Sequence, residues 1–396
     1  MFANLQKPIA DKIFTLVSEY QDDLSPEKMN LVIGVFNDED GKVPLLNSVH
    51  QAEQKILSLK NNKNYLPILG DSNYISAVTK LVFGEQHKYV VNEDLIVAQT
   101  PGGTGALRLA GDLIFAANPT ATVWLSNPTW ANHPNIFNAS GLKIKNYAYY
   151  DASKHNLDFD AMLQDLSQAK AGDVVLLHGC CHNPTGVDLS VEQWERVGKL
   201  ACEKDLIVLI DFAYQGFAEG VNEDRVGIEV ISSMPLNLMV ASSCSKNFGL
   251  YNQRLGSLSV YIKDESARPL VKAKMTACIR TNYSNPPAHG ANIVATILND
   301  HRLYSLWLDE LKQMRDNLKH IRTKFDEVFA QRGLSDYAYL ESQNGMFSLL
   351  PLLKDQIQVL KDKYHVYMVG SGRINVCALI GDRIDILADI MKNKLS

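Results

Sequence analysis

Short continuous apolar runs recur through the first two thirds of the chain, and each one stops at a polar turn. A run without alternation is typical of a strand that is covered on both faces of its sheet. Helical periodicity lies between the runs, as in residues 192–204. This order predicts an α/β fold with a mostly parallel, doubly wound sheet, in which ligands bind beyond the carboxyl ends of the strands. The predicted strands are residues 94–100, 122–126, 173–178, 206–211 and 238–242.

The rest of the chain predicts less regular elements. An amphipathic stretch covers residues 11–20, and a helix is predicted over residues 73–83. Residues 279–287 form a turn-rich connector. A long helical region with alternating charges then runs to Arg332, and we expect it to link two domains. From Gly333 onward the pattern changes to shorter alternating segments.

A glycine turn follows the first predicted strand. The sequence Pro101-Gly-Gly-Thr-Gly105 precedes a helix that begins at Ala106, and backbone N–H groups in such a turn can hold a phosphate. A P-loop would end in Gly-Lys-Ser/Thr, and the dinucleotide fingerprint needs a glycine where Arg108 stands. Gly103 and Thr104 are therefore candidates for binding the phosphate of a smaller compound, the alternative being a purely structural turn.

One lysine stands among hydroxyl groups directly after the run 238–242. Ser243 and Ser245 surround Lys246 in the sequence, and Arg254 follows eight residues later. An amine at the end of a buried strand, beside a second cation, can be kept partly deprotonated and can condense with an aldehyde. The serines and the arginine suit a phosphate carried by the same compound. The alternative is an ordinary solvated lysine.

Other strand ends carry a carboxylate, an amide and two aromatic rings. Asp211 would be costly to bury without a partner, and a ring nitrogen kept protonated by the carboxylate is a suitable one. Tyr214 could meet a ring oxygen, whereas capping of the next helix is the alternative for this pair. Trp130 could stack on a flat ring or pack in the core. Together with Asn183 and Lys246, these positions favour one site for a phosphorylated aldehyde.

Two further positions suit a carboxylate ligand. Arg373 follows Gly372 at a predicted strand edge, where it is either a fork for a carboxylate or a surface arginine. Gly34 interrupts the apolar run 31–36, which indicates either a close approach of the backbone to a ligand or an ordinary bulge.

Composition narrows the classes of function. The chain of 396 residues has a net charge of −5 with interspersed charges, which argues against nucleic-acid binding. The first residues lack the regions of a signal peptide, and no apolar run reaches membrane-spanning length. The six cysteines include no CxxC pair, and the spacing of His178 and His182 around Cys180 and Cys181 matches no usual zinc site, so we expect no metal. A cytoplasmic protein with reduced thiols is expected.

Taken together, these stretches resemble the aspartate aminotransferase family of fold type I pyridoxal phosphate enzymes, in the branch that holds aspartate and aromatic amino acid aminotransferases. The resemblance covers nearly the whole chain. It implies a large cofactor domain at residues 46–312 and a smaller α/β domain at 313–396, to which the N-terminal arm, residues 1–45, contributes. The motifs that carry it are Asn64-Tyr65, Gly102-Gly-Thr-Gly105, Ser126-Asn-Pro-Thr-Trp130, Cys180-Cys-His-Asn-Pro-Thr-Gly186, Asp211-Phe-Ala-Tyr-Gln-Gly216, Ser245-Lys-Asn-Phe-Gly-Leu-Tyr251, Asn282-Tyr-Ser-Asn-Pro-Pro287 and Ser371-Gly-Arg373.

The resemblance implies a role for each candidate in the cofactor site. Lys246 would bond to the aldehyde carbon of pyridoxal 5′-phosphate and shuttle the proton, and Asp211 would pair with the ring nitrogen. Tyr214 and Asn183 would hold the ring hydroxyl oxygen, and Trp130 would stack over the ring. The residues implied around the phosphate are Gly103, Thr104, Ser243, Ser245, Arg254 and Tyr65.

The resemblance also implies a homodimer whose sites are shared between subunits. Tyr65 and Arg280 would act in the partner's site, where Arg280 would bind the side-chain carboxylate of the substrate. Arg373 would fork onto the α-carboxylate, and Gly34 would close over it. The implied substrate-binding residues are Gly34, Trp130, Asn183, Arg280 and Arg373.

Two positions depart from the family pattern. Gly102 stands where many animal members have serine, which removes one contact to the phosphate. Cys244 stands where bacterial relatives tend to carry an aromatic residue, which changes the packing beneath the cofactor.

The implied function is transfer of an amino group from L-aspartate, and also from glutamate and aromatic amino acids, to 2-oxoglutarate by a ping-pong mechanism. The alternative in the same branch acts mainly on tyrosine and phenylalanine. A decarboxylase or β-lyase on this scaffold is disfavoured by the two-carboxylate clamp of Arg373 and Arg280. A cofactor-binding transcription regulator would need a DNA-binding domain, for which we expect no room in the chain.

Overall fold

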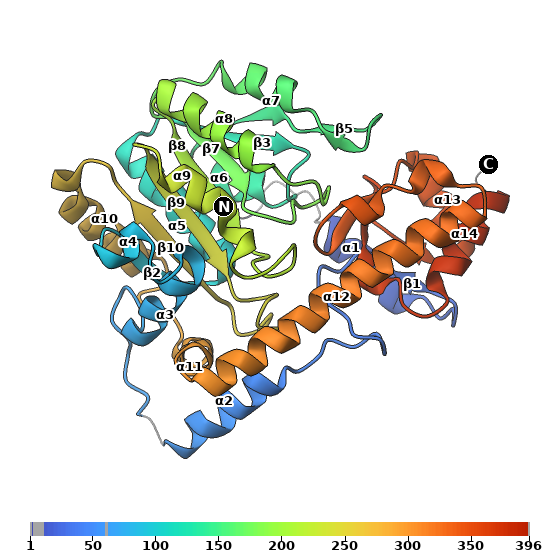
Figure 1. Ribbon diagram of the computed structural model, residues 1–396, viewed down its shortest axis with the longest axis horizontal. Helices are drawn as coiled ribbons and strands as arrows, with labels where there is room; N and C mark the ends of the chain where they lie inside the picture. The colour runs from blue at the N-terminus through green and yellow to red at the C-terminus, as the bar shows by residue number, and fades with distance from the viewer. Residues whose placement is uncertain (1, 3–11, 60–61, 395–396) are drawn as a thin grey trace. The chain divides into compact units, whose positions relative to one another are not determined.

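The computed structural model describes residues 2, 12–59 and 62–394, and the chain divides into two compact units (Figure 1). The larger unit comprises Val43–Asn317 and Gln343–Gly345. The smaller unit comprises the described residues of Met1–Lys42, Leu318–Ser342 and Met346–Ser396. Residue 1 and residues 3–11 of the expected N-terminal arm lie outside the described residues, as does the first residue of the amphipathic stretch predicted at 11–20.

A seven-stranded sheet forms the centre of the larger unit, with the strand order β2-β10-β9-β8-β7-β3-β4. β10 is antiparallel to both of its neighbours, and the remaining pairs are parallel. Every strand except β10 therefore ends at the same edge, which confirms the predicted doubly wound α/β fold. The strands are β2 (Ile96–Pro101), β3 (Thr122–Asn127), β4 (Lys143–Ala148), β7 (Val174–His178), β8 (Ile207–Phe212), β9 (Asn237–Ser243) and β10 (Leu255–Tyr261).

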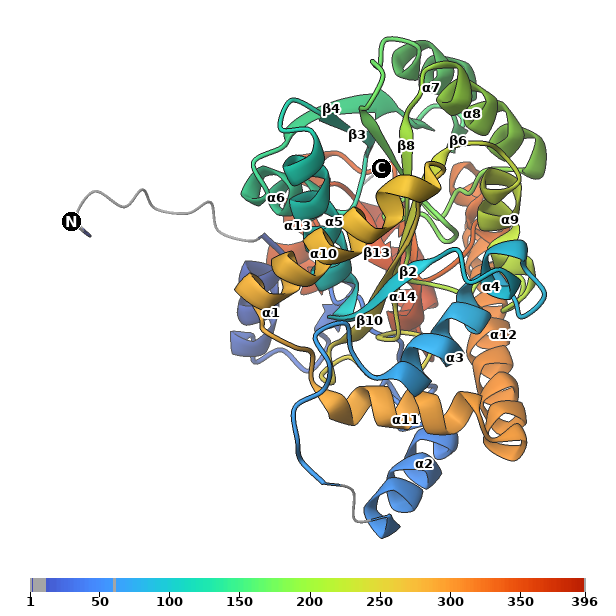
Figure 2. The ribbon, with the colours of Figure 1, turned by 90° about the vertical axis from the view of Figure 1, so that its left-hand side faces the viewer.

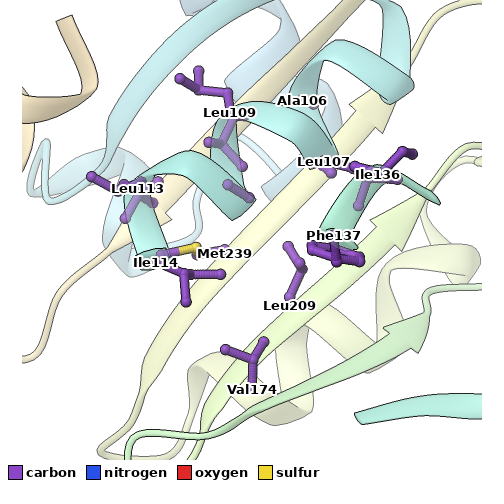
Figure 3. Packing of buried hydrophobic residues seen from close by; sticks show 14 of the residues in the cluster. Ala106, Leu107, Leu109, Leu113, Ile114, Ile136, Phe137, Val174, Leu209 and Met239 are labelled. Carbon is purple, nitrogen blue, oxygen red and sulfur yellow. The ribbon is translucent and has the colours of Figure 1, made fainter. Parts of the chain in front are cut away.

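Helices cover both faces of this sheet, and Figure 2 shows α5, α6 and α10 on one side with α8 and α9 on the other. Figure 3 shows how the α5 side chains meet Phe137 of α6 and the strand residues Leu209 and Met239. Phe137 and Leu209 are fully buried, and burying a side chain of this kind contributes about 1.5–3 kcal/mol. The helices are α5 (Gly102–Ala117), α6 (His133–Ala139), α8 (Val191–Glu203), α9 (Val226–Ser232) and α10 (Arg268–Asn282).

Polar residues in the sequence fix where several helices begin. Asp71 accepts a hydrogen bond from the Tyr74 backbone N–H at the start of α3, and Ser190 and Gln193 form a capping box at the start of α8. Among the described residues, no helix is both long and apolar enough to cross a membrane. The other helices of the larger unit are α2 (Asn47–Ser58), α3 (Ser72–Phe83), α4 (Lys88–Val91), α7 (Phe159–Leu166) and α11 (Ala288–Leu298), and α12 (His301–Gln331) runs from this unit into the smaller one.

The smaller unit combines segments from both ends of the sequence. β1 (Met29–Asn30) pairs in parallel with β12 (Val366–Tyr367), and β11 (Phe347–Leu349) pairs antiparallel with β13 (Arg373–Asn375). The helices here are α1 (Lys12–Asp22), α13 (Lys354–Tyr364), α14 (Arg383–Lys394) and the end of α12. The pairing of β1 with β12 makes the N-terminal segment an integral part of this unit.

Two predictions of local structure need correction. The connector predicted at 279–287 begins later, because α10 continues to Asn282, held by the buried side chains of Met275 and Ile279. β4 and β10 were absent from the predicted strands. β4 is largely exposed, and β10 includes glycine and serine residues that interrupt its apolar pattern.

Candidate active site

Lys246 lies in the turn after β9, at the edge of the sheet where the parallel strands end. Its side chain is mostly buried, and its Nζ lies 4.8 Å from the centre of the Tyr214 ring. Burial lowers the pKa of Lys246 to about 8, with a further lowering from the charge of Arg254, whereas the charge of Asp211 opposes both. The neutral amine of Lys246 is therefore more accessible near neutral pH than that of a solvated lysine.

Asp211 is buried near the end of β8, which is the strand next to β9. Its Oδ2 lies 3.0 Å from Nε2 of His133, and Nδ1 of His133 lies 2.8 Å from the Thr129 hydroxyl. Burial raises the pKa of Asp211, but the hydrogen bond and charge of His133 outweigh it and hold the pKa below its ordinary value. An ionised, oriented carboxylate results.

Two further imidazoles lie beside this pair. His178 and His182 are buried with ring centres 4.1 Å apart, and burial lowers the pKa of His178 to about 3. The described residues offer neither ring nitrogen of His178 a hydrogen-bond partner. Candidate ligand atoms of His133, His178 and Asp211 lie within 4.8 Å of one another. A metal ion there would have to displace a hydrogen bond of His133, which uses both of its ring nitrogens.

The glycine turn that was predicted to hold a phosphate lies at the start of α5. Gly102 has a φ of +73°, and a Cβ at this position would lie 2.5 Å from Nη2 of Arg254. A Cβ on Gly103 would lie 3.2 Å from Cβ of Ser243. Arg254 donates to the Ser245 hydroxyl at 3.2 Å. The N-cap residue Pro101 makes no side-chain hydrogen bond to this helix start, and backbone N–H groups at such a start can bind an anion.

Gly102 thus has a local reason for departing from the serine of many animal members. A side chain there would meet the guanidinium of Arg254, and its left-handed backbone conformation also favours glycine. Thr104 lies two residues further along, partly buried in the same helix start. The other departure, Cys244, is buried with its Sγ 3.6 Å from the Tyr74 hydroxyl. The neighbouring Tyr74 leaves room for a small thiol at position 244.

Asn183 lies in the loop after β7 with its side chain buried. Its Oδ1 has no hydrogen-bond partner among the described residues. Asp188 holds this loop by accepting hydrogen bonds from the backbone N–H groups of Cys181 and His182, both at 2.9 Å. A buried amide oxygen on a fixed loop, without a partner among the described residues, is poised to contact a ligand.

Trp130 takes an intermediate position between the two expected roles. The indole is partly buried and packs against the hydrophobic core cluster. It also meets the His133 ring edge-on, with ring centres 5.2 Å apart. It is therefore close to the Asp211 pair while it contributes to the core.

The structure does not bring every predicted residue to Lys246. Tyr65 is 91% exposed on the loop after α2, and Arg280 is exposed in the last turn of α10, where it donates to the Ser284 hydroxyl. Within the described residues, no hydrogen bond or ion pair joins either side chain to Lys246. Gly34 and Arg373 lie in the smaller unit.

The residues of the larger unit suit a phosphorylated pyridine aldehyde. Lys246 supplies a weakly protonated amine, Asp211 an ionised carboxylate, and Asn183 an amide oxygen without a protein partner. The glycines of the cradle leave room for a phosphate that a Cβ would fill. Amine, carboxylate and cradle all lie at the carboxyl ends of parallel strands.

Comparisons with known proteins decide the family. Residues 26–390 match the family described as Aminotransferase class I and II. The chain belongs to this aminotransferase family. It is 46% identical over 385 residues to an aspartate aminotransferase of Salmonella typhi, covering 97% of each chain. It is 41% identical to an aromatic-amino-acid aminotransferase of Pseudomonas aeruginosa, covering 98% of this chain and 97% of that one.

A solved structure agrees with this assignment. The aromatic-amino-acid aminotransferase from Burkholderia pseudomallei, covalently bound to pyridoxal phosphate, superimposes with a TM-score of 0.96 at 38% identity, over the full length of both chains. This aminotransferase is thus a pyridoxal-phosphate-dependent enzyme of the class I and II family, as the resemblance implied.

Sequence reasoning missed some residues that shape this aminotransferase site. His133 and Thr129 orient Asp211. Thr129 lies in the motif that ends at Trp130, and His133 follows that motif by three residues. Asp188 follows Asn183 by five residues, a spacing that carries no recognised pattern. His178 was considered only as a metal ligand, and its contact with the Asp211 pair depends on strand register, which pairs it with Asp211.

Proposed function

We propose that this aminotransferase transfers the amino group of L-aspartate to 2-oxoglutarate, with glutamate and aromatic amino acids as further donors. The observation that carries the proposal is Lys246, a lysine with a pKa of about 8 whose Nζ lies over the Tyr214 ring and is influenced by the charge of Asp211. The substrate preference is supported by the higher identity to the aspartate aminotransferase than to the aromatic one.

The chemistry of each side chain in the cofactor site suggests which part of the cofactor it would bind. The cradle glycine Gly103, with Thr104, Ser243, Ser245 and Arg254, would hold the phosphate. When bound, the cofactor supplies an aldehyde carbon and an electron-withdrawing ring. Asp211, kept ionised by His133, would hold the proton on the ring nitrogen, and Tyr214 and Asn183 would contact the ring oxygen, with Trp130 stacked over the ring.

Lys246 is the proposed catalytic base. In its neutral form, its Nζ can accept the proton from Cα of the amino acid, and its lowered pKa keeps that form accessible near neutral pH. The Tyr214 ring beside Nζ limits the directions that the amine can take. For the Cα–H bond to break instead of the bond to the α-carboxylate, the α-carboxylate of the substrate must be bound by another residue, away from Lys246.

We assign that binding to two arginines. Arg373, with Gly34 beside it, would bind the α-carboxylate, and Arg280 of the second subunit would bind the distal carboxylate of aspartate, glutamate and 2-oxoglutarate. An arginine in the last turn of a helix and exposed to solvent, as Arg280 is, suits a role in another chain's site.

We further propose that the enzyme is a homodimer that works in the cytoplasm. Three large apolar side chains are exposed within nine residues, Leu57 at 81%, Leu59 at 59% and Tyr65 at 91%. Such a group favours burial in an interface. The six cysteines are free, as expected in a reducing compartment. The larger unit would be the cofactor domain.

The second candidate is an aromatic amino acid aminotransferase of the same branch. Solved structures of aromatic aminotransferases superimpose on this chain with TM-scores of 0.96 and 0.95. A panel of donors with 2-oxoglutarate as acceptor separates the two: a kcat/KM for aspartate above that for tyrosine supports the proposal, and the reverse ranking supports the alternative. Turnover without any 2-oxo acid would instead indicate lyase or decarboxylase chemistry.

The variant Arg280→Ala tests the specificity assignment within this panel. Removing one partner of a desolvated charge pair costs roughly 3–5 kcal/mol, so kcat/KM for aspartate should drop on the order of a hundred to a few thousandfold. Tyrosine and phenylalanine should lose far less. An equal loss for both classes of donor would remove Arg280 from the specificity role.

A further inference from the structure

One aromatic ring in the smaller unit touches both residues that are proposed to receive the α-carboxylate. Phe347, on β11, is buried with 3% of its surface exposed. The guanidinium carbon of Arg373 lies 4.5 Å from the centre of its ring. A Cβ on Gly34 would lie 2.9 Å from Cζ of the same ring. The ring therefore contacts both the guanidinium of Arg373 and the backbone of Gly34.

Hydrogen bonds fix the glycine segment to the strand that carries the arginine. Arg373 donates from Nη2 to the Val32 carbonyl at 2.6 Å. Asn375, two residues along β13, donates from Nδ2 to the carbonyls of Ile33 at 2.5 Å and Val35 at 2.8 Å. The backbone on both sides of Gly34 is thus held against β13, which leaves the ring of Phe347 as its apolar support.

Phe347 is itself held at its backbone by a buried arginine. Arg322 of α12, only 2% exposed, donates to the Phe347 carbonyl at 2.9 Å and to the Ser348 hydroxyl at 2.8 Å. β11 also pairs with β13 through Leu349 and Arg373. The ring and the guanidinium are therefore carried by two paired strands, which hold the backbones of both residues in place.

We infer that Phe347 is a positioning residue for binding of the substrate α-carboxylate. This inference rests on the role proposed above for Arg373. An aromatic face attracts a guanidinium that lies over it and limits the positions that the guanidinium can take. The ring of Phe347 therefore restricts where Arg373 can present its N–H donors, and the same ring sets how closely the Gly34 backbone approaches. Phe347 touches no substrate in this role and acts through Arg373.

The test compares Phe347→Leu and Phe347→Met with Phe325→Leu in the loaded enzyme. Phe325 is a fully buried phenylalanine of the same unit that stacks on Phe329, with ring centres 3.8 Å apart. Its replacement by leucine makes the same chemical change away from Arg373. Two readouts are needed: KM and kcat for both aspartate and tyrosine, and calorimetric affinity for succinate, a dicarboxylate without an amino group.

We expect both Phe347 variants to raise KM for aspartate and tyrosine by similar factors of about 5 to 20, the range for loss of a partly desolvated cation–aromatic contact. The kcat should change much less, and succinate affinity should drop by a similar factor. Because every amino acid has an α-carboxylate, the effect should not distinguish the donors. Phe325→Leu should lower the melting temperature while KM and succinate affinity stay at wild-type values.

Arg373→Lys separates failure of this inference from failure of the proposed function. If Arg373→Lys weakens succinate binding while both Phe347 variants bind as wild type, Phe347 has no positioning role and Arg373 keeps its own. If Arg373→Lys leaves KM and succinate affinity unchanged, the α-carboxylate role of Arg373 is wrong and the inference is overturned with it. KM increases in the Phe347 variants that match those of Phe325→Leu would also overturn it.

Discussion

At the scale of single residues, the site depends on side chains whose protonation is set by burial. A lysine with a pKa of about 8 is deprotonated in about one molecule in ten at pH 7, against fewer than about one in a thousand for its ordinary value of 10.5. The same burial makes Lys246 unfavourable for folding while it is charged. Asp211 shows the opposite outcome, since His133 lets it stay ionised in spite of burial.

The first prediction concerns this cost in the cofactor-free protein. The pKa of Lys246 is lowered on folding, so between about pH 8 and 10.5 the unfolded chain binds more protons, and stability rises with pH there. Relative to the wild type, Lys246→Met should gain up to about 3 kcal/mol below pH 8, and this gain should vanish towards pH 10.5.

Urea unfolding of both proteins across this pH range measures the difference. Lys272→Met, at an exposed position of α10, is the control and should differ from the wild type by a constant amount. A difference for Lys246→Met that stays level from pH 7 to 10.5 would mean that the amine is not desolvated in the folded protein.

The second prediction concerns the approach of Arg254 to Gly102. In Gly102→Ala the new Cβ would lie 2.5 Å from the guanidinium, so the arginine must leave the cradle. Cofactor affinity should then decrease about 10- to 100-fold, the loss expected for one charge-assisted phosphate contact. Fluorescence titration of the cofactor-free protein with pyridoxal phosphate measures it.

Gly333→Ala is the matched control for this change. Gly333 has a similar φ of +75°, but nothing lies within 4 Å of its added Cβ. Both variants should lose stability from backbone strain, whereas only Gly102→Ala should bind the cofactor less tightly. If both variants bound the cofactor with equal affinity, the contact of Arg254 with the cofactor would not depend on its close approach to Gly102.

At the scale of elements, strands were predicted most accurately where the apolar runs in the sequence were continuous. β7 and β8 were anticipated nearly to the residue because each is buried along almost its whole length. β10 was missed because its apolar residues are separated by Gly256, Ser257 and Ser259, which pack inside the sheet. Its antiparallel insertion between β2 and β9 depends on long-range pairing, which local pattern does not encode.

In the candidate site too, residues marked by a local sequence pattern could be predicted, and residues that depend on long-range contacts could not. Lys246, Asp211 and the glycine turn could be predicted because each follows a recognisable strand. His133 and Phe347 could not be predicted, because each contacts a residue that is distant in the sequence. His133 contacts Asp211, 78 residues away, and Phe347 contacts Gly34. Tyr65 and Arg280 were assigned from the resemblance, and both side chains are exposed to solvent.

The third prediction concerns the loop that carries Asn183. Asp188→Ala removes the acceptor for the Cys181 and His182 backbone N–H groups and for the Asn344 amide. Leaving buried donors unpaired should cost about 3 kcal/mol or more in stability, and the freed loop should also weaken cofactor binding. Urea unfolding and cofactor titration measure the two effects.

Asp264→Ala provides the comparison for this loop. Asp264 also accepts two hydrogen bonds from a nearby residue, the backbone N–H and hydroxyl of Ser266, but in an exposed turn. Water can replace those bonds, so stability and cofactor affinity should stay near wild type. If Asp188→Ala were equally mild, the loop would not depend on its carboxylate.

At the scale of the whole molecule, the proposed sharing of sites has a direct consequence for mixed dimers. A Lys246→Ala chain and an Arg280→Ala chain should each be inactive with aspartate in pure form. In a mixed dimer one site contains both wild-type residues, and random mixing gives about half of all dimers one such site. Activity with aspartate should therefore reappear when the two variants exchange subunits.

Mass spectrometry of differently tagged chains verifies the exchange, and aspartate turnover gives the readout. Mixing Lys246→Ala with Asp211→Ala is the control, because both residues belong to one chain's site and every mixed dimer should then remain inactive. Verified exchange without recovery in the first mixture would show that each site is built within one chain.

The union of both chain ends in the smaller unit also bears on how the protein is made. Asp23 bonds His365 at 2.7 Å across 342 residues, and β1 has no strand partner other than β12 among the described residues. At about 5–20 residues per second, a ribosome needs roughly 20–70 s to travel that distance. The N-terminal segment leaves the ribosome first but must wait for nearly the last part of the chain before its strand can pair. The larger unit can complete its sheet during that interval, so the order of synthesis favours its folding first.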